Sequence, residues 1–168
     1  MGVGVGTILR RYVTHALMNP SAVYLADFPD LRFRPILQGQ GIVRPEPGSF
    51  VFDDSEPRTV GGFGSSGNGR PVFTQATGAV GVIVPKTQGV ESRDLADRYA
   101  EATRRALHTG PWSSFTDAGG ATLALNMFDF FVGGRLQPSR IITRNDSPNG
   151  EPYYLVVTRY RGTAQPTD

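Results

Sequence analysis

A glycine pattern between residues 61 and 69 is the closest match in this sequence to a ligand-binding motif. Gly62, Gly64 and Gly67 have the G-x-G-x-x-G spacing that lets a backbone approach a pyrophosphate. That chemistry needs a helix directly after the glycines, because the helix N-terminus holds the anion. The residues that follow, Arg70-Pro71-Val72-Phe73, are typical of a strand instead. We therefore expect a flexible loop here, with a nucleotide site as the minor alternative.

Other residue types that carry chemistry are few and poorly grouped. The carboxylates of Asp53, Asp54 and Glu56 lie close together, but they lack the glycine and the distal glutamate of a calcium loop. The chain has no cysteine, which excludes disulfides, thiolate zinc sites and a cysteine nucleophile. His15 and His108 stand on expected helices, and no G-x-S-x-G elbow accompanies them. We expect no catalytic residue, no metal and no cofactor.

Charge is spread along the chain. The seventeen basic residues, of which Lys86 is the single lysine, give a net charge of +2 and form no run of five or more. This is a weak electrostatic signature for a nucleic-acid binder, so we expect mostly solvated arginines and some at protein interfaces. The most apolar stretch, 123–132, is too short to span a membrane. The N-terminus lacks the order of a signal peptide, and we expect a soluble, non-exported protein.

Two helices are expected from apolar periodicity, at about 7–18 and 93–108. Asn19-Pro20 ends the first helix, and Ser92 is expected to cap the second. On the exposed side of the second helix the i,i+4 spacing predicts two ion pairs. These pairs are Asp94–Arg98 and Glu101–Arg105.

Strands are expected in the remaining apolar segments. Residues 72–84 contain a nearly continuous apolar run, typical of a central strand covered on both faces. In 121–132 the alternation changes parity, which predicts a bulge near 126–129. In 153–161 we expect Tyr153, Leu155 and Val157 to face inward. Further strands are predicted at 22–28, 49–53 and 139–144, with extended pieces near 31–37.

These elements predict an α+β fold, with a mixed or antiparallel β-sheet packed by the two main helices and a long Pro/Gly-rich loop region. A single domain is expected over 1–161. Within it we expect a mobile loop over 54–71, because such a polar, glycine-rich segment buries too little apolar surface to offset its ordering entropy. Residues 162–168 are expected to form a polar tail.

The order of elements over 72–161 resembles a known family. A strand ends in Gly81-Val82-Ile83-Val84-Pro85, a glycine-containing loop leads into a helix at Leu95-Ala96-Asp97, and a final strand ends in Val156-Val157-Thr158-Arg159-Tyr160-Arg161. With the N-terminal helix, this order is similar to the tail terminator proteins of long-tailed bacteriophages. The resemblance implies a small subunit that forms a hexameric ring, caps the tail tube and joins it to the head–tail connector.

We therefore expect a structural virion protein without enzymatic activity. Its partners would be other copies of itself, the tail tube protein and a head–tail connector or stopper. DNA could pass through the lumen of the ring without being bound specifically, and no membrane would be involved. It would be found in the virion tail or neck, and in the host cytoplasm during assembly. Alternatives are a tail tube subunit or a head–tail stopper, both expected to be more strongly β, and a small ligand-binding α/β domain. Candidate interface residues are Arg58, Phe63, Arg70, Trp112, Phe128, Phe130 and Tyr160.

Overall fold

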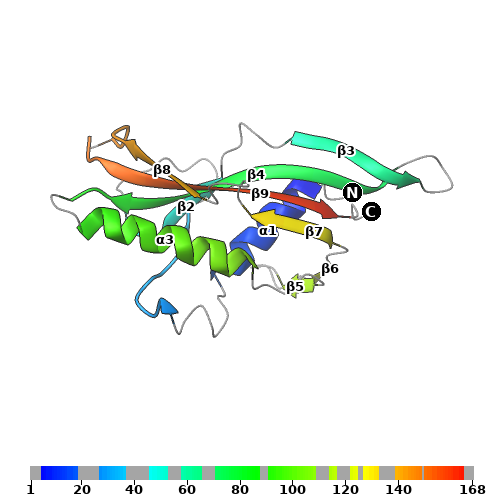
Figure 1. Ribbon diagram of the computed structural model, residues 1–168, viewed down its shortest axis with the longest axis horizontal. Coiled ribbons are helices and arrows are strands. Elements are labelled where there is room, and N and C mark those ends of the chain that lie inside the picture. The colour runs from blue at the N-terminus through cyan, green and yellow to red at the C-terminus, as the bar shows by residue number, and fades with distance from the viewer. Residues whose placement is uncertain are drawn as a thin grey trace.

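The computed structural model describes residues 5–18, 27–36, 46–52, 58–65, 71–87, 91–108, 114–116, 122–124, 127–132, 139–148 and 150–164. They form an α+β fold with one seven-stranded sheet, a separate two-stranded sheet and two long helices (Figure 1). The expected fold class is therefore confirmed.

Two long antiparallel strands form the centre of the sheet. Strand β4 (Pro71–Pro85) pairs with β9 (Tyr153–Ala164) without interruption from Thr74↔Ala164 to Pro85↔Tyr153. The Val80–Val84 run lies in the half of this ladder that ends at Pro85 and is fully buried, as its composition predicts.

Each central strand carries two shorter strands along its other edge. β2 (Ser49–Phe52) and β3 (Arg58–Ser65) pair with β4, while β8 (Ser139–Arg144) and β7 (Met127–Val132) pair with β9. β1 (Arg34–Pro35) lies parallel to β2 and makes the sheet mixed. β5 (Ser114–Thr116) and β6 (Thr122–Ala124) form the separate two-stranded sheet.

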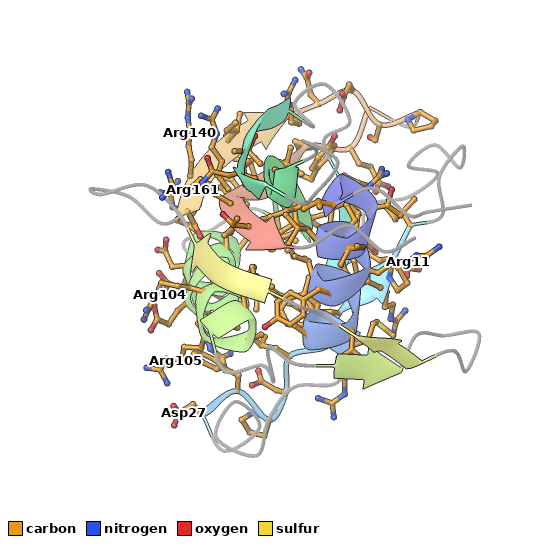
Figure 2. All side chains as sticks on the ribbon, turned by 90° about the vertical axis from the view of Figure 1, so that its right-hand side faces the viewer. Arg11, Asp27, Arg104, Arg105, Arg140 and Arg161 are labelled. Carbon is orange, nitrogen blue, oxygen red and sulfur yellow. The ribbon has the colours of Figure 1, made fainter. Side chains whose placement is uncertain are left out.

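Helices α1 (Val5–Met18) and α3 (Glu91–His108) cover the same face of the sheet (Figure 2). Their apolar sides pack on the even-numbered residues of β4 and β9, and the core contains Ile8, Leu9, Tyr12, Val80, Val82, Val84, Ala102, Leu107, Tyr154, Val156 and Tyr160. Burying one large side chain of this kind stabilises the fold by about 1.5–3 kcal/mol. This packing holds the two helices against the central ladder.

The expected orientation of the last strand is wrong. Tyr154, Val156 and Tyr160 face the helices, whereas Tyr153 lies on the other face and donates a hydrogen bond from its hydroxyl to Asp146. Both faces of this strand are rich in apolar residues, so alternation alone leaves two choices. Packing against α1 and α3 decides between them.

The glycine-rich segment also differs from expectation. Residues 58–65 form β3 and pair with β4 from Arg58↔Thr77 to Ser65↔Pro71, instead of lying in a loop. Glycine is a weak strand former, but the long neighbouring strand supplies backbone partners along the whole segment. Residues 54–57 and 66–70 of the expected mobile loop are outside the described residues.

Four other strand predictions have mixed outcomes. The predicted strands at 49–53 and 139–144 are confirmed as β2 and β8. The segment 121–132 forms two strands, β6 and β7, and the predicted irregularity appears as a register shift between Met127 and Asp129. Of 22–28, Asp27 and Phe28 are described, and neither lies in a strand.

Candidate interaction surfaces

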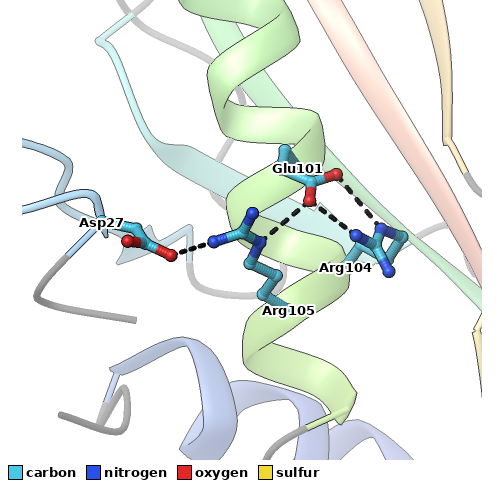
Figure 3. Close-up of polar contacts among 4 residues, drawn as sticks. All are labelled: Asp27, Glu101, Arg104 and Arg105. Atoms are coloured by element: carbon cyan, nitrogen blue, oxygen red, sulfur yellow. Dashed lines mark hydrogen bonds and ion pairs between the residues drawn. The ribbon is translucent and has the colours of Figure 1, made fainter. Parts of the chain in front are cut away.

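The exposed side of α3 carries a charge-matched network. Glu101 accepts hydrogen bonds from Arg104, at 2.5 and 3.2 Å, and from Arg105, at 2.9 Å (Figure 3). The guanidinium of Arg105 also pairs with Asp27 and lies 5.4 Å from the centre of the Phe28 ring. The hydrogen bonds from Arg104 are the main reason that the pKa of Glu101 is lowered. The predicted Glu101–Arg105 pair is confirmed, and the network has no excess charge.

A second contact joins α3 to the same stretch of chain. Arg98 binds both carboxylate oxygens of Asp30, at 2.6 and 2.8 Å, in the bidentate geometry that arginine favours. The Tyr99 hydroxyl donates to the Arg32 carbonyl at 3.1 Å, and its ring meets Phe33 edge-on at 5.5 Å. Arg98 therefore pairs with Asp30 and not with Asp94 as expected, because the 27–33 segment lies against this side of α3.

The start of α3 differs from its predicted cap. The helix begins at Glu91, and the Ser92 hydroxyl donates a hydrogen bond to the Thr87 carbonyl at 3.3 Å. Ser92 is therefore inside the first turn, where it fixes the preceding loop and does not accept from the helix N–H groups as a capping serine does.

Four exposed arginines lie on the face of the sheet that points away from the helices. Arg159 and Arg161 alternate with the core-facing residues of β9 and are exposed. In the neighbouring β8, Arg140 stands opposite Val157 and Arg144 opposite Tyr153, which places both on that same face. We call these four residues the arginine row. Figure 2 shows Arg140 and Arg161 on the side of the molecule away from Arg11.

At one end of the sheet the two outer strands are β3 and β7. β3 and β7 flank the same stretch of the central ladder, since they pair with residues 71–77 of β4 and 160–164 of β9. Within the described part of the chain, the outer edge of each pairs with no further strand. Figure 1 shows β3 and the adjoining part of β4 reaching past both helices.

A shallow hollow of about 440 Å³ lies at the other end of the sheet, between the ends of β4 and β9. Its charged side chains are those of Glu46, Lys86 and Glu151, and the Lys86 N–H donates to the Pro152 carbonyl at 3.0 Å. The hollow is lined by prolines and by side chains of both charges, and no hydrogen-bonded pair of a nucleophile and a base is found among them.

The predicted interface residues are placed very differently from one another. Arg58 and Phe63 lie in the edge strand β3, and Phe128 and Phe130 lie in β7. Arg70 and Trp112 lie outside the described residues. Tyr160 is 4% exposed and packs in the core of the subunit, so its burial needs no neighbouring chain. The arginine row was not recognised from the sequence, because its members become neighbours only through β8–β9 pairing.

The catalytic motifs considered above gain no support from the geometry. The G-x-G-x-x-G glycines that are described lie in β3, which is followed by β4 and not by a helix. The predicted strand after this pattern is therefore confirmed. The carboxylates of residues 53, 54 and 56 fall outside the described part.

Among the described residues, no group of three or more histidine or acidic side chains is arranged to hold a metal ion. No helix in that part of the chain combines the length and apolar character needed to cross a bilayer. In comparisons with known proteins, neither a family model nor a curated protein matches this chain.

Proposed function

We propose that this protein is a structural subunit of a bacteriophage tail, a tail terminator that forms a ring between the tail tube and the head–tail connector. The observation that carries the proposal is that β3 and β7, at the same end of one sheet, each have an outer edge that pairs with no further strand among the described residues. In this role the protein would have no catalytic activity, and it would be found in the virion neck and, during assembly, in the host cytoplasm.

Open edges suit ring formation because they present rows of backbone N–H and C=O groups that another strand can pair with. The β3 edge of one subunit meeting the β7 edge of the next is a head-to-tail contact, and such contacts generate closed rings when the rotation closes. Among the residues whose side-chain burial the structure describes, Met18 is the one large apolar side chain that is exposed, at 45%.

The two helices favour a terminator over the other neck and tail proteins. A tail tube subunit or a stopper is expected to be more strongly β, whereas α1 and α3 together provide half of the core and have 14 and 18 residues. The strand–loop–helix that supports the family resemblance is present as β4 followed by α3. The ligand-binding alternative is weakened because two glycines of its motif, Gly62 and Gly64, lie in β3, which pairs with β4.

Native mass spectrometry and particle imaging of the purified protein test the ring directly. We expect a single closed oligomer, with six copies according to the family resemblance. A protein that stays monomeric at every concentration and salt condition, with no ring at the virion neck, would overturn the proposal.

Two consecutive proline substitutions test whether β3 is the contact. Along an antiparallel edge strand, successive N–H groups point alternately to the paired strand and outward. Of Gly62→Pro and Phe63→Pro, one therefore removes an outward N–H and the other removes an N–H bonded to β4. We expect the variant that loses the outward N–H to be a folded monomer. The variant that loses the N–H bonded to β4 should have a lower melting temperature. Rings that survive in both folded variants would exclude β3 as the contact.

A further inference from the structure

We propose that Arg140 and Arg144 prevent two copies of this chain from pairing through the outer edge of β8. This edge lies at the other end of the sheet from β3 and β7, and the proposal does not depend on ring formation. It rests on the unpaired backbone of β8, on the charge state of its two arginines and on the spacing between them.

The outer edge of β8 has what a second strand needs for pairing. One side of β8 pairs with β9 along its whole length. Within the described part of the chain, the hydrogen bonds of the β8 residues go to β9 and to no other segment. The middle of the strand consists of Ile141 and Ile142, which are β-branched and suit a sheet. Such an edge is a template for a further strand unless something opposes the pairing.

Both arginines of β8 keep their full charge. Their side chains are exposed, and in the described part of the chain neither Arg140 nor Arg144 has an ion pair or a side-chain hydrogen bond. On α3, by contrast, Arg98 and Arg104 each bind a carboxylate that offsets the guanidinium charge. Because a guanidinium stays protonated in proteins, the charge at the β8 edge is permanent.

The spacing of the arginines decides what a second copy would meet. Two β8 edges related by a two-fold axis pair antiparallel, in an isologous contact. When Ile142 stands opposite its own counterpart, Arg140 of each copy stands opposite Arg144 of the other. Like charges directly opposite each other in a sheet are destabilising. When Ile141 stands opposite its counterpart instead, the two Arg140 side chains are diagonal neighbours, which long side chains still reach.

The strands proposed for the ring contact have a different charge pattern. β3 contains one charged residue, Arg58, and β7 contains one, Asp129. These two charges are opposite in sign, and the other residues of both strands are neutral. Charge therefore opposes a second copy at β8 and does not oppose one at the β3–β7 end of the sheet.

Arg140→Glu tests the proposal, because this single substitution turns the repulsion into attraction. The carboxylate introduced in each copy would stand opposite Arg144 of the other copy, twice in every contact. Sedimentation velocity at low salt should show particles of at least double the mass of the wild-type species. These particles should dissociate at about 1 M salt, where charges are screened beyond ~3 Å. Arg140 is exposed, so the variant is expected to keep the wild-type melting temperature.

A disulfide gives a readout that is specific for β8, since the chain has no cysteine of its own. In the double variant Arg140→Glu/Ile142→Cys, oxidation by copper phenanthroline should link two copies. Opposite residues of an antiparallel pair have Cα atoms about 4.5–5.5 Å apart, which a disulfide spans. Ile142→Cys alone should stay unlinked, because its two arginines are still present. Equal linking in the two variants would overturn the proposal.

Two further variants separate the charge pattern from net charge. Arg11→Glu makes the same charge change at an exposed position of α1, on the side away from Arg140 (Figure 2), and should sediment like the wild type. Arg140→Glu/Arg144→Glu should not associate by itself, but it should form mixed particles with the wild type. Association of Arg11→Glu as strong as that of Arg140→Glu would overturn the proposal. A folded Arg140→Glu that sediments like the wild type would also overturn it, because charge would then not be what keeps this edge unpaired.

Discussion

Tyr160 of β9 stands directly opposite Gly78 of β4, and its phenol ring lies where a side chain at residue 78 would be. A Cβ atom at Gly78 would come within 2.4 Å of the Tyr160 hydroxyl oxygen and 2.6 Å of the ring. The glycine therefore makes room for a large aromatic side chain that is 4% exposed and belongs to the core.

Gly78→Ala should lower the free energy of unfolding by about 1–3 kcal/mol, because the Tyr160 ring must leave its place in a packed core. Chemical denaturation measures this loss. Gly6→Ala is the control, since nothing lies within 4 Å of its Cβ position and alanine favours a helix by about 0.5–1 kcal/mol. If Gly78→Ala is as stable as the wild type, Tyr160 does not occupy this space.

Gly48 and Gly150 provide a second matched pair of substitutions. Both have positive φ, +84° and +67°, but a Cβ at Gly48 would lie 1.8 Å from the Arg32 carbonyl oxygen, while the Cβ position of Gly150 is open. We expect Gly150→Ala to cost about 1–2 kcal/mol from backbone strain alone. Gly48→Ala should cost clearly more, since it also separates β1 from β2. Similar melting temperatures for the two variants would contradict this.

Acid should loosen the contact between α3 and residues 27–33. The hydrogen bond from Arg98 lowers the pKa of Asp30, so its stabilising effect is present above the unfolded pKa and is lost as pH falls through the folded pKa. Asp30→Asn should remove this part of the acid sensitivity. Hydrogen exchange of residues 31–33 at pH 7 and at pH 3 measures it. A wild type and a variant with the same loss of protection on acidification would exclude the Asp30 contact as the cause.

Alkali should destabilise the core at Tyr12. Burial raises the pKa of Tyr12 to about 12, whereas an unfolded tyrosine titrates near 10. The stabilising contribution is therefore present below pH 10 and is lost as pH rises towards 12. Tyr12→Phe should make the loss of stability between pH 10 and pH 12 smaller. Part of the loss should remain, because burial also raises the pKa of Tyr153 to about 12.

At neutral pH, Tyr12→Phe should cost about 0.5–1.5 kcal/mol, because its hydroxyl donates to the Leu107 carbonyl at 3.3 Å. Thermal unfolding between pH 7 and pH 11 measures both effects. An unchanged alkaline decline in the variant would show that another group causes it.

Local patterns in the sequence were sufficient for several elements. The stripe of apolar residues in α3, the β-branched run of β4 and the parity change before Phe130 each reflect a period that one segment carries by itself. These features predicted both helices, the central strand and the bulge. The resemblance to tail terminators added an expected role, which remains a proposal.

Long-range pairing decided the rest. β3 is a strand because β4 is long enough to pair with it, and the inward face of β9 was chosen by the helices and not by its own alternation. The sequence by itself determined how many arginines the chain has and that no run of them occurs. Only the tertiary structure sorted them into those bound by carboxylates on α3 and those aligned along β8 and β9. The physical reason is that strand register brings distant residues within reach of one another, and no local period contains that information.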